Sequence, residues 1–188
     1  MTSLRVTAGA LRGRRIAVPP RDVRPTSERA RQAYFNIVAD RMHEAVFLDL
    51  FAGSGIFSFE AISRGAASAV AVEQDRRNAD AIAARAAEWE APIRVVTGDV
   101  LTSLGRLGAT PFDLIYADPP YAYPHYRELL AAIDAQLRLG PAALVAIEHQ
   151  RNSSPFDAPT SRLRQLRRAE YGEVWITFFA ADDGTADD

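Results

Sequence analysis

Short apolar runs alternate with helical stretches through the middle of the chain, and this alternation limits the fold more than any other feature. Strands alternating with helices pair in parallel, and continuous apolar strands are covered on both faces. We therefore expect an α/β fold with a mostly parallel sheet and helices on both sides. The predicted strands lie at 46–51, 69–73, 93–97, 112–117 and 143–147, and helices are predicted at 56–64, 75–89 and 126–137.

Both ends of the chain add short elements to this core. Residues 4–18 predict a small β-hairpin around glycines. Thr26 or Ser27 can cap a helix that runs to about Asp40. Residues 162–179 predict a C-terminal antiparallel hairpin, which brings the expected sheet to seven strands.

Positive charge is concentrated at the N-terminal end. The net charge of the 188 residues is −2, yet residues 1–41 hold nine arginines against three acids, a net charge of +6. Residues 42–181 carry a net charge of −4, and residues 182–188 hold four aspartates. A basic segment on an acidic body is typical of a protein that binds a polyanion. We expect a basic extension, a main domain and a flexible acidic tail with these boundaries.

The composition excludes several classes of protein. The longest uncharged run, residues 50–59, has ten residues, whereas a membrane-spanning helix needs roughly 20. Arg5 and Arg12 lie too close together for the apolar region of a signal peptide. There is no cysteine, and the three histidines show no metal-ligand spacing. We therefore expect a soluble cytoplasmic protein without disulfides or a metal site.

The first strand of the core ends in a glycine-rich loop, Asp49-Leu50-Phe51-Ala52-Gly53-Ser54-Gly55. Gly53 and Gly55 let the backbone turn tightly and approach a ligand without a Cβ in the way. Asp49 can accept hydrogen bonds from an ammonium group or a bound water. The third glycine of the dinucleotide-binding pattern is absent, because Ser58 occupies its position. The loop suits a nucleoside better than a pyrophosphate, although an ordinary strand-to-helix turn would show the same glycines.

Acids at the ends of the next two strands strengthen the nucleoside interpretation. Glu73 lies 20 residues after Gly53, where a carboxylate can bind both hydroxyls of a ribose. Asp99 can accept a hydrogen bond from an adenine amine, or cap the helix that begins at Val100. The carboxyl ends of parallel strands meet at one edge of a sheet, so these acids and the loop are expected to lie close together.

The fourth strand leads directly into Asp118-Pro119-Pro120-Tyr121. Two prolines fix the backbone and remove two N–H donors, so the Asp118 carboxylate and the Pro119 carbonyl present acceptors. Tyr121 adds a flat ring. Acceptors beside a ring suit a planar base with an exocyclic NH2 group, whose nitrogen then faces an electrophile. The alternative is a rigid turn with a core tyrosine.

In their order along the chain, these motifs resemble those of class I S-adenosylmethionine-dependent methyltransferases, and the Asp-Pro-Pro-Tyr form resembles enzymes that methylate amino groups of nucleic-acid bases. Almost the whole chain except the acidic tail is similar to the RsmD family, which methylates guanine N2 in the small-subunit (16S) ribosomal RNA of bacteria. The chain differs at residues 56–58, where the family has smaller side chains. The resemblance implies a Rossmann-like class I fold. Its specific elements are Gly13-Arg14-Arg15, Arg24-Pro25-Thr26, Phe35-Asn36, Glu60-Ala61-Ile62-Ser63-Arg64-Gly65-Ala66 and Tyr171-Gly172.

The resemblance also implies a role for each matching position. Asp49, Gly53 and Gly55 would hold the methionine part of S-adenosylmethionine, Glu73 its ribose and Asp99 its adenine. Further cofactor contacts would come from Phe51, Ser54, Gln74, Val100 and Thr26. The catalytic group would be Asp118, Pro119, Pro120 and Tyr121, which orient the target guanine. Because a sulfonium methyl is already activated, catalysis would lie mostly in placing the nitrogen in line with the methyl–sulfur bond.

The implied partner is small-subunit ribosomal RNA within a ribosomal particle, and a monomer is the default expectation. Guanine N2 inside a duplex is not open to in-line attack, so the base must be flipped out or already unpaired. The basic extension would bind RNA phosphates. The candidate side chains are Arg12, Arg14, Arg15, Arg24 and Arg29.

Three other interpretations stay open from the sequence. A DNA adenine-N6 methyltransferase would show the same catalytic motif, although 188 residues leave little room for its target-recognition domain. A protein glutamine methyltransferase would need similar chemistry for an amide NH2. A non-catalytic RNA-binding module could retain a vestigial cofactor fold.

Overall fold

The computed structural model describes most of the chain, and a few of the predicted residues fall outside it. Arg24, Tyr121, the Thr26 side chain and the acidic tail are among these, so the predictions for them lie outside the described residues. The described residues are 2–18, 25–108, 110–120, 123–151, 156 and 160–181, without the side chains of residues 25–27.

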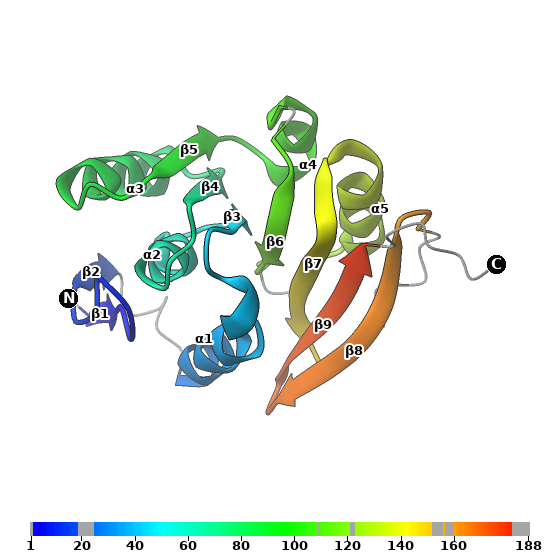
Figure 1. Ribbon diagram of the computed structural model, residues 1–188, viewed down its shortest axis with the longest axis horizontal. Helices are drawn as coiled ribbons and strands as arrows, with labels where there is room; N and C mark the ends of the chain where they lie inside the picture. The colour runs from blue at the N-terminus through cyan, green and yellow to red at the C-terminus, as the bar shows by residue number, and fades with distance from the viewer. Residues whose placement is uncertain are drawn as a thin grey trace.

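A seven-stranded sheet forms the centre of the molecule, with the strand order β5-β4-β3-β6-β7-β9-β8 (Figure 1). Strands β3 to β7 pair in parallel, and β9 pairs antiparallel with both β7 and β8. The predicted parallel α/β fold with a C-terminal antiparallel hairpin is confirmed. The strands are β3 (Val46–Leu50), β4 (Ser68–Glu73), β5 (Ile93–Thr97), β6 (Phe112–Ala117), β7 (Leu139–Gln150), β8 (Leu163–Tyr171) and β9 (Val174–Ala181).

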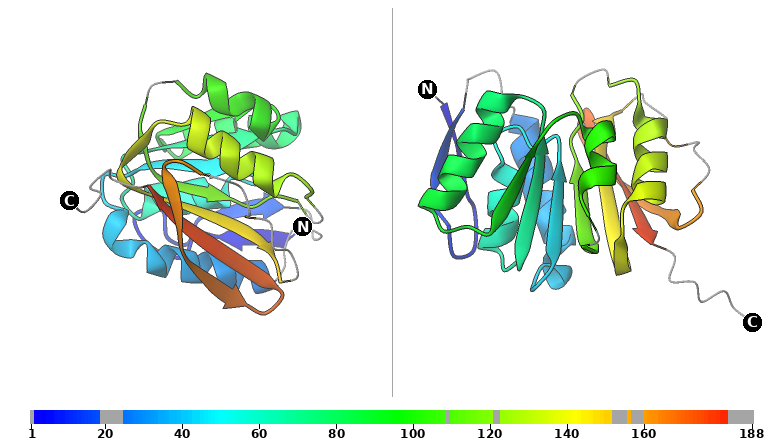
Figure 2. Two further views of the ribbon diagram at one scale, coloured as in Figure 1. Left: turned by 90° about the vertical axis from the view of Figure 1, so that its right-hand side faces the viewer. Right: turned by 90° about the horizontal axis from the view of Figure 1, so that it is seen from above.

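Helices cover both faces of the sheet (Figure 2). Along β3, Leu48 and Leu50 pack toward α4 and α5, whereas Phe47 packs toward α1 and α2 on the opposite face. Residues alternate between the faces of a strand, so Asp49 lies on the same face as Phe47. The helices are α1 (Pro25–Ile37), α2 (Ile56–Ser63), α3 (Arg76–Glu88), α4 (Val100–Ser103) and α5 (Tyr126–Gln136), with 3₁₀ turns η2 (Ala39–Arg41) and η3 (Leu104–Arg106).

The predicted N-terminal hairpin is a separate two-stranded sheet of β1 (Thr2–Arg5) and β2 (Arg15–Val18). In Figure 1 it lies beside α2, outside the main sheet. Val6, Ile16 and Val18 pack in one buried cluster with Phe59 of α2 and Ile82 of α3. The hairpin therefore shares a hydrophobic core with the main domain.

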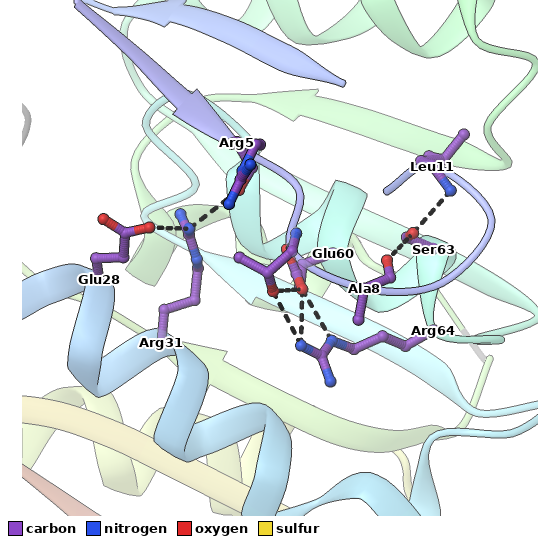
Figure 3. Close-up of polar contacts among 9 residues, drawn as sticks. Arg5, Ala8, Leu11, Glu28, Arg31, Glu60, Ser63 and Arg64 are labelled. Carbon is purple, nitrogen blue, oxygen red and sulfur yellow. Dashed lines mark hydrogen bonds and ion pairs between the residues drawn. The ribbon is translucent and has the colours of Figure 1, made fainter. Parts of the chain in front are cut away.

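Polar contacts from α2 fix the turn of this hairpin (Figure 3). Glu60 is fully buried; it accepts hydrogen bonds from the Thr7 backbone and hydroxyl and from Arg64, whose Nη2 lies 2.8 Å away. Ser63 accepts from the Leu11 backbone N–H at 2.8 Å. Gly9 has φ +77°, and a Cβ there would lie 1.5 Å from the Ser63 carbonyl oxygen. Only glycine fits this position, because both the backbone conformation and the space require it.

Two predicted boundaries differ from the structure. The first helix ends at Ile37 rather than near Asp40, and the chain continues as the 3₁₀ turn η2. Strand β7 begins at Leu139 and ends at Gln150, well beyond the apolar run 143–147, because it pairs with Phe112 at one end and with β9 at the other. Backbone pairing extends a strand past its buried residues. None of the helices in the described segments combines the length and hydrophobicity that a bilayer crossing requires.

Candidate active site

The site lies where the chain direction across the sheet reverses. The chain runs from β3 outward through β4 and β5, then returns to β6 on the other side of β3. Ligands of such sheets bind beyond the carboxyl ends of the strands at this reversal. Two cavities of about 400 and 160 Å³ lie there, and Phe51, Asp118 and Pro120 line both of them. The glycine-rich loop and the Asp-Pro-Pro segment therefore meet, as the sequence predicts.

Asp49 is a buried carboxylate at the end of β3. It is 2% exposed and lines the larger cavity. Its Oδ2 accepts hydrogen bonds from the Ser58 backbone N–H at 3.0 Å and the Ser58 hydroxyl at 2.6 Å. Burial raises the pKa of Asp49 to about 7, although the Ser58 hydrogen bonds favour the ionised form. A cationic ligand group at this position would stabilise the carboxylate.

The loop after Asp49 has a constrained backbone. Phe51 has φ +64°, a left-handed conformation that is costly for a bulky side chain and that concentrates at functional sites. Gly55 has φ +77°, and a Cβ there would lie 2.9 Å from Ile82 of α3. Gly53 and Ser54 line the larger cavity. Gly55 thus serves close packing of the loop on α3, and Gly53 and Ser54 face the cavity.

Glu73 is held rigidly at the end of β4. It is 7% exposed and lines the smaller cavity. One oxygen accepts from the Gly53 N–H at 2.7 Å and the other from the Asp75 N–H at 2.7 Å. Each oxygen keeps a lone pair, so the fixed carboxylate can accept further hydrogen bonds from the hydroxyls of a ligand.

The smaller cavity has apolar walls around this acid. Phe51, Val100 and Pro120 line it together with Gln74. The Tyr123 ring packs edge-on against Phe51, with centroids 5.2 Å apart. Such walls beside a carboxylate suit a nucleoside, whose base is flat and whose ribose carries hydroxyls.

Asp99 caps a helix, which is one of the two roles that the sequence predicts for it. Its Oδ1 accepts from the Thr102 backbone N–H at 3.0 Å at the start of α4. It is exposed and does not line either of the two cavities. Burial raises the pKa of Tyr123 to about 12, and the charge of Asp99 contributes to this rise. The predicted adenine contact remains a prediction.

Asp118 follows β6 at the junction of the two cavities. It is exposed, and its backbone N–H donates to the Leu50 carbonyl at 3.3 Å, which ties the segment to β3. Pro119 is buried, whereas Pro120 is exposed and lines both cavities. Beneath this segment, Tyr116 donates to Glu148 at 2.5 Å in the core.

The far wall of the larger cavity comes from the N-terminal segment. Leu4, Ile16 and Val18 of the hairpin line it, and so do Glu28 and Arg31 of α1. The sequence interpretation missed Arg31, although an arginine three residues before the apolar Tyr34 on the inner face of a helix is an unusual signal. Tyr123, Asn78 and Arg85 were also missed.

The predicted RNA-binding arginines inside the described segments lie at the surface. Arg12, Arg14, Arg15 and Arg29 are all exposed. Arg14 lies over the Trp89 ring at 5.1 Å, and Arg15 donates to the Ser3 hydroxyl at 3.0 Å. None of these four arginines lines either of the two cavities, which separates them from the cofactor candidates.

Comparison with known proteins identifies the family. The model of a family described as Conserved hypothetical protein 95 matches residues 4–180. Ribosomal RNA small subunit methyltransferase D of Escherichia coli K12 is 34% identical over 149 residues, which cover 78% of this chain and 75% of that protein. The chain belongs to the RsmD family of methyltransferases.

Further relatives agree in sequence and in structure. YlbH of Bacillus subtilis is 30% identical to this RsmD-family chain over 181 residues, covering 94% of this chain and 98% of that protein. The solved structure of yhhF from Escherichia coli superposes with a TM-score of 0.84 at 29% identity, covering 96% and 99% of the two chains. The fold is therefore the class I methyltransferase fold, and S-adenosylmethionine is the cofactor.

The residues of this RsmD-family protein fit that cofactor. S-adenosylmethionine carries a nucleoside at one end and a charged amino acid at the other. The smaller cavity has apolar walls beside Glu73, and the larger cavity is lined by charged side chains that include Asp49 and Arg31. The carboxylates Asp49, Glu73 and Asp118 line the two cavities, with Asp118 lining both, which suits a sulfonium cation. The larger side chains at 56–58 are accommodated: Ile56 and Phe57 line the larger cavity, and Ser58 binds Asp49.

Proposed function

We propose that this protein transfers a methyl group from S-adenosylmethionine to the N2 amine of a specific guanine in small-subunit ribosomal RNA. The position of Asp118 carries the proposal, because it lies at the carboxyl end of β6 and lines both cavities of the cofactor site. The name of the Escherichia coli relative supports the choice of ribosomal RNA. We also propose that the reaction takes place in the cytoplasm on a ribosomal particle, and that the enzyme acts as a monomer.

In the proposed site, the cofactor lies along the ends of β3 and β4. Glu73 binds its ribose, Gln74 and Val100 contact its adenine, and Asp49 with Gly53 faces its methionine end. Bound there, S-adenosylmethionine supplies an activated methyl group at the junction of the cavities. The remaining proposed cofactor contacts are Phe51, Ser54, Gly55, Asp99 and Thr26.

Asp118 and the two prolines position the base in this proposal. The Asp118 carboxylate accepts a hydrogen bond from the guanine amine, which aims the nitrogen lone pair at the methyl group. As the nitrogen gains positive charge, the same carboxylate stabilises it. Pro119 and Pro120 keep the segment rigid and Tyr121 stacks on the base. The base enters unpaired or flipped from its helix.

The N-terminal extension contacts the RNA in this proposal. Arg12, Arg14, Arg15 and Arg29 are exposed, and they bind phosphates together with Arg24. Such binding weakens steeply as the salt concentration rises. The hairpin is also part of the cofactor cavity, so residues 1–41 serve both the RNA and the cofactor.

The substrate is tested with methyl-labelled S-adenosylmethionine. Small ribosomal subunits that lack the modification, naked ribosomal RNA and double-stranded DNA are offered in parallel, and the nucleosides are separated after digestion. Label in N2-methylguanosine from the subunits is the expected result. Label only in N6-methyladenine from DNA would overturn the substrate assignment. Absence of label from all three, although the cofactor binds, would favour a non-catalytic RNA-binding module or a protein substrate.

The role of Asp118 is tested by substitution. Asp118→Ala is expected to lower turnover roughly 10²- to 10³-fold, because the amine loses its acceptor as charge develops. Binding of S-adenosylmethionine, measured by calorimetry, should change little. Asp118→Asn is the matched control: it keeps a carbonyl acceptor without the charge and should lose less activity. Weakened cofactor binding with normal turnover at saturation would contradict the role.

A further inference from the structure

Arg31 on α1 is a buried cation with few partners. The residue is 2% exposed. Its Nη2 donates to the Arg5 carbonyl at 3.2 Å and lies 3.8 Å from Glu28 Oε1, as Figure 3 shows. A separation of 3.8 Å exceeds a hydrogen bond, and the Glu28 side chain is 48% exposed, so this ion pair contributes little. The buried Nε has no hydrogen-bond partner.

This arrangement is costly without a further partner. A buried charge normally has an opposite charge and hydrogen bonds around it. Burial lowers the pKa of Arg31 from its ordinary value, and the nearby Arg64 adds to this, while Glu60 and Glu28 act in the opposite direction. Among the described residues, the acceptors found beside Arg31 all face Nη2, which leaves the buried Nε N–H without one.

Arg31 lines the larger cavity together with residues of the glycine-rich loop. Asp49, Gly53 and Asp118 line the same cavity, and Glu73 lines the adjoining one. With the ribose at Glu73, the amino-acid end of the cofactor extends into the larger cavity. That end is a zwitterion, with an ammonium group and a carboxylate on one carbon. Asp49 supplies an anionic group and Arg31 a cationic group in this one cavity.

We propose that Arg31 binds the carboxylate at the amino-acid end of S-adenosylmethionine, and so completes the cofactor site from the N-terminal extension. The proposal rests on the cofactor placement proposed above. A planar guanidinium matches a carboxylate with two parallel hydrogen bonds.

An RNA phosphate fits this position less well. Arg31 is almost fully buried, and Leu4, Ile16 and Val18 of the hairpin form the adjacent cavity wall. The backbone of a polymer would have to enter the cavity to reach it, whereas the end of a small cofactor would fit in that space.

The test compares S-adenosylmethionine with its decarboxylated form, which lacks only the carboxylate. Binding of both to the full chain is measured by calorimetry without RNA. The unmodified protein is expected to prefer S-adenosylmethionine roughly 10- to 100-fold, the range of a hydrogen-bonded charged pair. Arg31→Met should bring the preference close to one by weakening the carboxylate-bearing ligand alone. Arg76→Met, an exposed arginine on α3, is the matched control and should keep the full preference.

The outcomes separate this proposal from the substrate assignment. Equal weakening of both ligands by Arg31→Met would overturn the carboxylate role, and so would an unchanged preference for S-adenosylmethionine. Should Arg31→Met fail to fold, Arg31→Lys decides, with an intermediate preference expected and an unchanged one contradicting the proposal. Because RNA is absent, a wrong RNA substrate leaves the result standing. Binding of neither ligand by the unmodified protein would instead overturn the cofactor placement and this proposal together.

Discussion

Asp49 and Glu60 are two buried carboxylates that contact the same helix, α2, and they are compensated in opposite ways. Glu60, on the helix itself, has a cation beside it, because Arg64 lies 2.8 Å away and also stacks over Phe35 at 5.0 Å. Asp49 has no such partner in the described segments, and the two hydrogen bonds that it accepts there both come from Ser58. One acid is fully satisfied within the protein, and the other lines a cavity.

The difference separates a structural acid from a ligand-binding one. Glu60 joins α2 to the N-terminal hairpin, so its contacts stabilise the fold. Asp49 keeps a raised pKa of about 7 because burial disfavours its charge and no cation offsets it. Perturbed groups of this kind cluster at functional sites.

The largest expected effect on stability comes from removing Glu60, the structural carboxylate of the two. Glu60→Ala removes the carboxylate that accepts from Arg64 and from the Thr7 N–H, and removing one partner of a buried pair costs about 3–5 kcal/mol. We expect a loss of about 3 kcal/mol in the free energy of unfolding, the low end of this range, because Arg64 keeps some contact with water. Denaturant unfolding at neutral pH measures it. Glu60→Gln, which keeps an acceptor, should lose less, and a loss below about 1 kcal/mol in Glu60→Ala would contradict the comparison.

The next effect concerns Asp49 and pH. Its folded pKa of about 7 lies above the unfolded value, so the native state retains a proton that the unfolded chain has lost between about pH 4 and pH 7. The free energy of unfolding should therefore fall across this window, by roughly 2–4 kcal/mol in total, and level off above pH 7. Asp49→Asn should remove that contribution.

A control variant sharpens the Asp49 prediction. Ser58→Ala keeps the acid but removes the hydroxyl hydrogen bond, which costs about 1–2 kcal/mol at pH 8. Its pH slope should persist, since the carboxylate remains buried. If the free energy of unfolding changed equally with pH in the unmodified protein and in Asp49→Asn, a group other than Asp49 would be responsible for the pH dependence.

The smallest expected effect tests the geometry of the Glu60 pair. Arg64→Lys keeps the charge but loses one of the two N–H contacts to Glu60 and the stacking over Phe35, which should cost about 1 kcal/mol. The exposed pair of Arg76 with Asp80, 3.8 Å apart, provides the comparison. Arg76→Lys should leave the unfolding free energy almost unchanged. Similar losses of unfolding free energy in Arg64→Lys and Arg76→Lys would mean that the burial of Glu60 does not strengthen its pair with Arg64.

Much of the candidate site could be predicted because parallel strands place their carboxyl ends together. The spacing of the loop, Glu73 and Asp118 was enough to bring them to one edge of the sheet, and the structure places all three around the two cavities. Asp99 shows the limit of this reasoning. An acid that ends a strand and also precedes a helix has the spacing of both a ligand contact and a helix cap. Only the hydrogen bond from Thr102 shows that Asp99 caps α4.

The sequence by itself determined the order of strands and helices, the nucleoside-type motifs and the family, because these depend on periodicity and on residues close together in the chain. The tertiary structure alone decided how the N-terminal hairpin joins the cofactor cavity and which buried charges are paired. Gly9 meets Ser63, Thr7 meets Glu60, and Arg31 lines a cavity with Asp49. These contacts join residues far apart in sequence, and no local pattern specifies them because long-range packing sets which side chains share a buried space.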